Sequence, residues 1–126
     1  MLFRSLAAAA RIAEVQDGEI GERVAESLRL AELDGALADR DARRLSVGEQ
    51  QRATIARALM TGPETLLMDE PMASLDPETA EKLGRTVARL SAERGLTVVV
   101  ATHRLAEARA VSSYAVMLDE IGRAHV

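Results

Sequence analysis

Residues 65–71 read TLLMDEP, and this stretch does most to decide how the chain can fold. An apolar run of leucine and methionine is closed by the acids Asp69 and Glu70 and then by Pro71. Such a run is typical of a buried strand, and acids placed directly after a strand can hold a metal ion or polarise a water molecule. By itself, however, the pattern is more often a pair of solvated acids at a strand end.

The residues that follow predict an alternation of helices and strands. From Pro77, apolar residues recur every three or four positions, which indicates a helix that Gly95 ends. Residues 96–101 are apolar and rich in valine without polar alternation, which is typical of a strand buried on both faces. We expect a further short helix over residues 105–111 and another strand over residues 114–118.

The order strand, helix, strand, helix, strand predicts an α/β protein with a parallel sheet and right-handed crossovers. Ligands of such sheets bind beyond the carboxyl ends of the strands. Asp69 and Glu70 follow one expected strand, and His103 follows the next. These side chains are therefore candidates for a common site, although a single histidine is more often a solvated imidazole.

The region before the first strand is expected to be helical. Ile20, Val24, Leu28 and Ala31 form one apolar stripe along a helix. A second helix is expected from Gly48 to about residue 60, where a Gly-Pro pair stops it.

The start of that second helix has two compatible interpretations. Ser46 followed three residues later by Glu49 is a capping box, which needs no ligand. A helix start also presents free N–H groups at the positive end of the helix dipole, which is a ready anion site. Asp76 before Pro77 is likewise an ordinary helix N-cap.

Composition excludes several classes of protein. The 126 residues include 16 basic and 20 acidic side chains, so the net charge of −4 shows no footprint for nucleic acid. Aromatic residues make up only 2%, and the absence of cysteine excludes disulfide scaffolds and zinc–thiolate sites. The longest apolar runs are much shorter than the ~18 residues of a membrane span, so none is expected.

Four motifs in a fixed order carry a family resemblance. They are LSVGEQQR at residues 45–52, the strand and acids of residues 65–70, SLD at residues 74–76, and the ATH that ends at His103. Together they resemble the signature motif, Walker B strand, D-loop and switch histidine of an ATP-binding-cassette (ABC) transporter nucleotide-binding domain. The implied fold is an ABC-type P-loop NTPase sheet, incomplete here, with part of the helical signature subdomain.

The resemblance implies a site for ATP with Mg²⁺. Asp69 would support the Mg²⁺ ion through the water shell of the ion. Glu70 would be the general base for the attacking water, and His103 would contact the γ-phosphate.

Two cassettes of this family sandwich their ATP molecules head to tail, so a second cassette is an implied partner. Ser46, Gly48 and Gln50 would bind the ATP held by that partner, and Asp76 would couple the two sites across the interface. A separate membrane permease is the other implied partner, which places the protein at the cytoplasmic face of a membrane. The QQR of the signature and the SLDPET stretch resemble prokaryotic import-type cassettes.

The sequence also departs from the family. No G-x-x-x-x-G-K-[ST] occurs, so we expect this chain to be the C-terminal half of a cassette and to be inactive alone. Val47 stands where the family usually has glycine, which is tolerable if φ is negative there. Met72 and Ala73 replace the more usual threonine and small residue.

We expect three parts: a helical-subdomain portion over residues 1–44, the signature helix with half of the ATPase core over 45–119, and a tail over 120–126. The tail back-translates in frame to a sequencing adapter (GAG ATC GGA AGA GCA CAC GTC), so we interpret it as non-native. Two alternatives stay open: a soluble ABC ATPase of DNA repair or chromosome maintenance, which usually lacks QQR, and a non-catalytic fragment. In this family the choice of transported substrate is expected to lie in the membrane and binding subunits.

Overall fold

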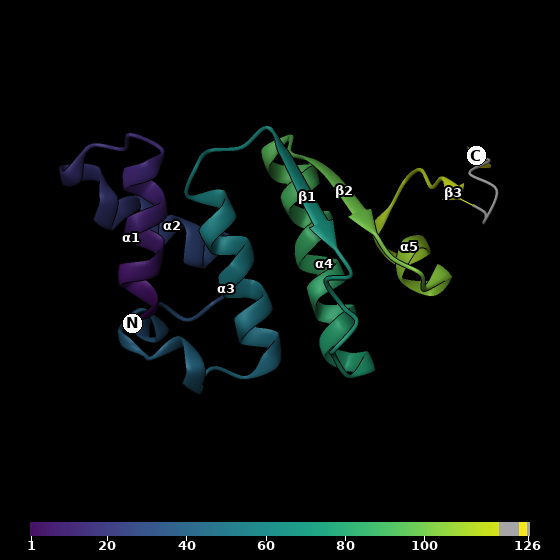
Figure 1. Cartoon of the computed structure of the whole chain (residues 1–126), viewed down its shortest axis with the longest axis horizontal. Coiled ribbons are helices and arrows are strands. Elements are labelled where there is room, and N and C mark those ends of the chain that lie inside the picture. The colour runs from purple at the N-terminus through teal and green to yellow at the C-terminus, as the bar shows by residue number, and fades with distance from the viewer. Residues whose placement is uncertain (119–123, 126) are drawn as a thin grey trace.

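The computed structural model describes residues 1–118 and 124–125 (Figure 1). Helices alternate with short 3₁₀ turns in the first part of the chain and with strands in the second. The helices are α1 (Leu2–Ile12), α2 (Ile20–Leu30), α3 (Val47–Leu59), α4 (Pro77–Arg94) and α5 (Leu105–Val111). The strands are β1 (Thr65–Asp69), β2 (Thr97–Ala101), β3 (Met117–Leu118) and β4 (Ala124–His125), and the 3₁₀ turns are η1 (Asp17–Glu19), η2 (Gly35–Asp39) and η3 (Ala42–Arg44).

Helices α1, α2 and α3 pack together and form the first part of the core. The predicted stripe on α2 is confirmed, because Ile20, Val24, Leu28 and Ala31 are all buried. Alanines of α1 are buried as well, and such small side chains let neighbouring helices approach closely. Within the described residues no helix combines the length and the apolar composition that a membrane crossing requires.

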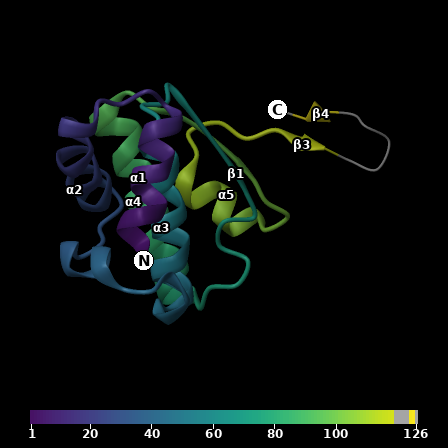
Figure 2. The same cartoon turned by 60° about the vertical axis from the view of Figure 1, so that its left-hand side comes forward.

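Strands β1 and β2 pair in parallel, as predicted, with Leu67 opposite Val99 and Asp69 opposite Ala101. The two strands lie against the helices on one side only (Figure 2). Leu66 is buried on that side, whereas Leu67 is 73% exposed and Val99 is 51% exposed on the other. The expectation that residues 96–101 form a strand buried on both faces is therefore wrong. The reason is that, in the part of the chain that the structure describes, helices cover this sheet on one side.

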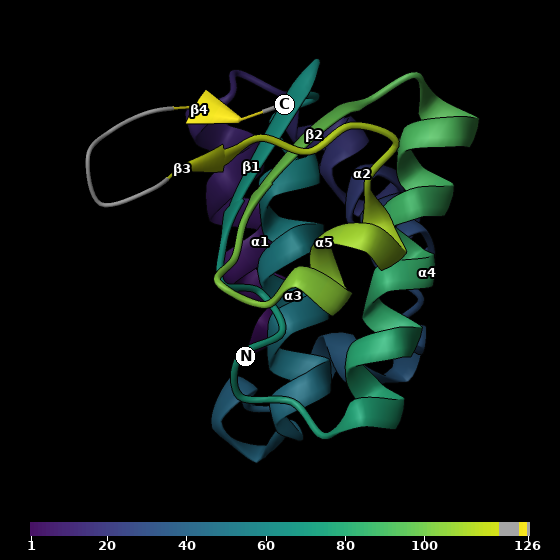
Figure 3. The ribbon, with the colours of Figure 1, turned by 90° about the vertical axis from the view of Figure 1, so that its right-hand side faces the viewer.

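The prediction of a third parallel strand over residues 114–118 is also wrong. Only Met117–Leu118 of residues 114–118 forms a strand, and it pairs antiparallel with Ala124–His125 in a separate sheet. Strands β3 and β4 lie apart from β1 and β2 in Figure 2, and in Figure 3, which is seen from their side, they lie in front of β1. The apolar character of a run does not specify which strand it pairs with. A strand of two residues also makes few contacts that could favour one pairing partner over another. Most of the tail over residues 120–126, with its adapter interpretation, lies outside the described residues.

Helix α4 backs the sheet and is delimited as the sequence predicts. Leu83, Val87 and Leu90 are buried along one face of the helix. The Asp76 side chain accepts a hydrogen bond of 3.1 Å from the Thr79 N–H and caps the N-terminus. Gly95 adopts φ +62°, the left-handed conformation that ends helices at glycine. The loop of residues 70–76 is thus tied to the start of a rigid helix.

Candidate functional site

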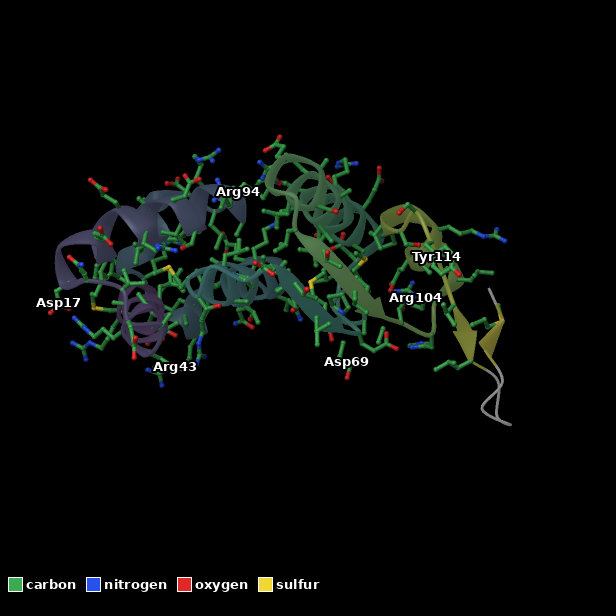
Figure 4. The ribbon with its side chains drawn as sticks, turned by 90° about the horizontal axis from the view of Figure 1, so that it is seen from above. Asp17, Arg43, Asp69, Arg94, Arg104 and Tyr114 are labelled. Atoms are coloured by element: carbon green, nitrogen blue, oxygen red, sulfur yellow. The ribbon has the colours of Figure 1, made fainter. Side chains whose placement is uncertain are left out.

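The carboxyl ends of β1 and β2 bring the predicted acids and the histidine together. The parallel register places Asp69 opposite Ala101, and the N–H of Glu70 continues the ladder by donating to the Ala101 carbonyl at 2.8 Å. His103 follows two residues after Ala101. Figure 4 shows Asp69 and Arg104 at the same end of the strands. The site is built by strand pairing between segments that are far apart in the sequence.

Glu70 and His103 form a close pair at this end. His103 Nδ1 lies 2.7 Å from Glu70 Oε1, and the backbone N–H of His103 donates to the same oxygen at 3.0 Å. A carboxylate can only accept, so this contact assigns the ring proton to Nδ1. The imidazole is largely exposed, and its Nε2 atom is the ring nitrogen left for another partner.

The backbone of Glu70 is unusual, because this residue has φ +45°. Left-handed conformations cost free energy at residues other than glycine and often occur at functional sites. The hydrogen bond from His103 is the main reason that the pKa of the Glu70 carboxyl lies below its ordinary value. Glu70 is therefore held in the ionised form, which is the form that can accept a proton from water.

Asp69 ends β1 with an exposed side chain. Among the described residues its carboxylate makes no hydrogen bond or ion pair, unlike that of Glu70. Mg²⁺ commonly binds proteins through one or two carboxylates and keeps several water ligands. The donor chemistry of Asp69 fits such an ion.

The start of α3 is a complete capping box. Ser46 Oγ accepts from the Glu49 N–H at 3.2 Å, and Glu49 Oε2 accepts from the Ser46 N–H at 2.8 Å. The pKa of Glu49 is lowered, chiefly by that backbone N–H. Val47 is not among the positive-φ residues, so the valine fits the helix without backbone strain. The N–H groups of Val47 and Gly48 precede the first intrahelical bond and remain available as donors.

Gly48 lies against the first turn of α4. A Cβ atom added at Gly48 would be 2.6 Å from Thr79 Cγ2, closer than real Cβ contacts come. The start of α3 and the start of α4, with its cap Asp76, are therefore adjacent. The pKa of Asp76 lies below its ordinary value, chiefly because of the Thr79 side chain and then because of the Thr79 backbone N–H.

Gln50 is engaged within the chain. Its Nε2 donates to the carbonyl of Leu45 at 3.1 Å and ties the preceding loop to the helix. The predicted residues thus fall into two groups: Asp69, Glu70 and His103 at the sheet end, and Ser46, Gly48, Gln50 and Asp76 at the helix starts. No hydrogen bond or ion pair among the described residues joins the two groups.

Two residues of the sheet-end group were missed by the sequence reasoning. Thr102 Oγ1 lies 3.4 Å from Glu70 Oε2 and 2.9 Å from Glu107 Oε2. Glu107 is the buried residue of α5. An acid one turn beyond a candidate histidine was the available signal, but a charged residue in a short helix is usually solvated.

Comparison with known proteins identifies the family of this chain. Residues 2–73 match the family model described as ABC transporter. The methionine import ATP-binding protein MetN of Cereibacter sphaeroides is 39% identical over 118 residues, which cover 94% of this chain and 33% of that protein. The chain thus spans about a third of the length of the curated relatives that it matches.

Solved structures give the same result. The dimeric structure of MJ0796, a bacterial ABC transporter cassette, has a TM-score of 0.64 and 41% identity, covering 76% of this chain and 41% of that one. For cbiO1 from Clostridium perfringens, part of the ABC transporter complex cbiONQ, the TM-score is 0.76 with 29% identity, covering 82% of this chain and 41% of that one. The fold is therefore that of an ABC-type P-loop ATPase cassette, and the family match over more than half of its residues shows that the chain belongs to the ABC transporter family.

Proposed function

We propose that this chain is part of an ATP-binding and ATP-hydrolysing subunit of an ABC transporter. The observation that carries the proposal is the Glu70–His103 pair at the end of the Walker B strand, with 2.7 Å between Oε1 and Nδ1. A carboxylate kept ionised beside an exposed imidazole is suited to accept a proton from an attacking water molecule. Glu70 is the base in this proposal, and His103 orients it while its Nε2 side faces the phosphate.

The signature helix has a separate role. Ser46 and Gly48 present a hydroxyl and an N–H group at the positive end of α3, where a phosphate anion is stabilised. We assign them to the ATP of a second cassette, as the resemblance to the ABC signature motif implies, and no hydrogen bond among the described residues joins them to Glu70 or His103. Gln50 contributes to the same contact, with its Nε2 atom bracing the loop at Leu45. Asp76 lies beside this surface and couples the two nucleotide sites.

Asp69 is the residue that would hold Mg²⁺ through the water shell of the ion. A bound Mg²⁺ ion neutralises charge on the phosphate groups of ATP. Asp69 and Glu70 are consecutive at the end of β1, so the residue that would hold the ion and the proposed base lie on the same side of the bound nucleotide in this proposal.

A membrane permease is the other partner in this proposal, and the ATPase subunit contacts it at the inner face of the membrane. The methionine import relative supports the import type. The helical region of roughly residues 20–44 is the part that we assign to the permease contact. Relatives that are transporter subunits favour this function over DNA repair.

Steady-state ATP turnover tests the proposal. In the intact cassette, Glu70→Gln removes the base and keeps the shape of the side chain, so we expect kcat to fall by about 10²–10⁴-fold. ATP-bound dimers should accumulate in this variant, which size-exclusion chromatography detects. Turnover at the wild-type rate would exclude Glu70 as the base.

The isolated 126-residue chain is the second arm of the experiment. It holds no phosphate-cradling glycine loop, which supplies many of the contacts to the nucleotide in this class of ATPase. We expect no turnover above that of its own Glu70→Gln variant. Glu70-dependent hydrolysis by this chain alone would contradict the assignment of activity to the larger assembly.

A further inference from the structure

Thr102 occupies the one position between the end of β2 and His103, and its hydroxyl lies between two carboxylates. Thr102 Oγ1 is 2.9 Å from Glu107 Oε2 and 3.4 Å from Glu70 Oε2. The same oxygen accepts the backbone N–H of Arg104 at 3.1 Å. The threonine therefore connects the proposed base to an acid in α5.

Proton counting decides which carboxylate receives the hydroxyl proton. A hydroxyl group has a single proton to donate, and the shorter contact is the one to Glu107. Glu70 Oε2 then faces the hydroxyl oxygen without taking its proton. Glu70 Oε1 is already occupied by two donors of His103. Oε2 is thus left as the carboxylate oxygen that is free to accept a proton.

Glu107 is an unusual residue to bury. It is only 9% exposed, and it is the buried position of α5, where an apolar side chain would pack without a desolvation cost. Arg104 Nη1 approaches its Oε1 at 2.7 Å as an ion pair, without the alignment of a hydrogen bond. A buried carboxylate fixed in this way is a rigid acceptor for the Thr102 hydroxyl.

We propose that Thr102 and Glu107 are positioning residues for the general base of the proposed ATPase. Glu107 draws the Thr102 proton away from Glu70, and the threonine oxygen then limits how the Glu70 carboxylate can rotate. This inference rests on the function proposed above, since it concerns how Glu70 is presented to water. Neither residue touches the nucleotide in this scheme.

The test compares variants of the intact cassette by kcat and by KM for MgATP. Thr102→Val removes the hydroxyl and keeps the shape, and we expect kcat to fall about 10-fold with KM unchanged, a smaller loss than the about 10²–10⁴-fold expected from removing the base itself. Thr102→Ser keeps the hydroxyl and should restore most of the rate. Glu107→Ala frees the hydroxyl to donate to Glu70 and should lower kcat by a similar factor.

The double variant Thr102→Val/Glu107→Ala distinguishes this role from a structural one. If both residues act through one hydrogen bond, the double variant should be no slower than the slower single variant. Additive losses, an increase in KM, or a serine variant as slow as the valine variant would overturn the proposal. Because Glu107→Ala leaves a buried cavity, circular dichroism melting checks its fold, and the valine and serine pair stays decisive if it unfolds.

Glu70→Gln, measured in the same preparation, distinguishes a failure of the proposed function from a failure of the positioning role. Wild-type turnover that does not depend on Glu70 would overturn the proposed function itself. Glu70-dependent turnover that Thr102→Val leaves unchanged would overturn only the positioning role.

Discussion

The hydroxyl of Thr86, fully buried in α4, donates a hydrogen bond of 2.6 Å to the carboxylate of Glu32, just beyond the end of α2. Arg89, one turn further along α4, reaches the same carboxylate at 3.3 Å and also donates to the Leu30 carbonyl at 2.9 Å. Glu32 adopts φ +55°, a conformation that usually favours glycine. These contacts connect the first, helical part of the chain to the helix that backs the sheet.

Replacing Thr86 by valine tests this connection. Valine has the same shape and removes only the hydroxyl, so the carboxylate loses one donor while the packing is kept. A hydrogen bond to a charged group commonly stabilises a protein by about 1.5–3 kcal/mol, and we expect a loss near the lower end because Glu32 keeps Arg89. Urea unfolding of the intact cassette measures the difference.

The same pair predicts a dependence on pH. The Thr86 hydrogen bond is the largest cause that lowers the pKa of Glu32 below its ordinary value of 4.5. The contact therefore contributes fully above the pKa of the unfolded chain, and its contribution is lost as the pH falls through the folded-state pKa. The difference in stability between wild type and Thr86→Val should shrink as the pH is lowered from neutral. A difference that stays constant across this range would show that the ionised carboxylate is not involved.

Gly48→Ala is expected to destabilise the protein by crowding rather than by backbone strain. Its added methyl group would meet Thr79 Cγ2 at 2.6 Å, and a short branched side chain cannot move away easily. Overpacking of this kind commonly costs about 1–3 kcal/mol, partly offset by the better helix propensity of alanine. Thermal unfolding measures the loss.

Thr79→Ser is the matched control for that substitution. It removes the crowded methyl group and keeps the backbone N–H that Asp76 caps. The double variant Gly48→Ala/Thr79→Ser should recover most of the lost stability. Equal melting temperatures of Gly48→Ala and the double variant would show that contact with the Thr79 methyl group does not cause the destabilisation.

The exposed pair Leu67 and Val99 predicts self-association of the isolated chain. These residues are opposite each other on the face of the sheet that no described element covers, and among the described residues each strand has an outer edge without a strand partner. Sedimentation velocity at rising concentration should show aggregates for wild type and fewer for Leu67→Thr/Val99→Thr. Ile12→Thr, which changes an apolar side chain that is 81% exposed at the end of α1, should have no such effect. A monodisperse wild-type chain would contradict the prediction.

Features that depend on neighbours three or four residues apart could be predicted from the sequence. The Ser46–Glu49 capping box, the Asp76 N-cap and the apolar stripes of α2 and α4 are all present as expected. Each of them is a contact within one helical turn, so the identity of a few nearby residues specifies it. The parallel pairing of β1 and β2 was predictable for a related reason, because a helix of suitable length separates the two strands.

Contacts between distant segments depended on the tertiary structure. The register that places Asp69 opposite Ala101 brings His103 to Glu70 and carries Thr102 between Glu70 and Glu107. No local pattern predicts that Glu107 is buried or that Gly48 lies against Thr79, because both follow from how α5 and α3 pack on α4. Residues 114–118 are a further example. Their apolar character could be recognised in the sequence, but the strand with which they pair could not. Side-chain chemistry is a local property of the chain, but the partners that each group meets are selected by packing and strand register.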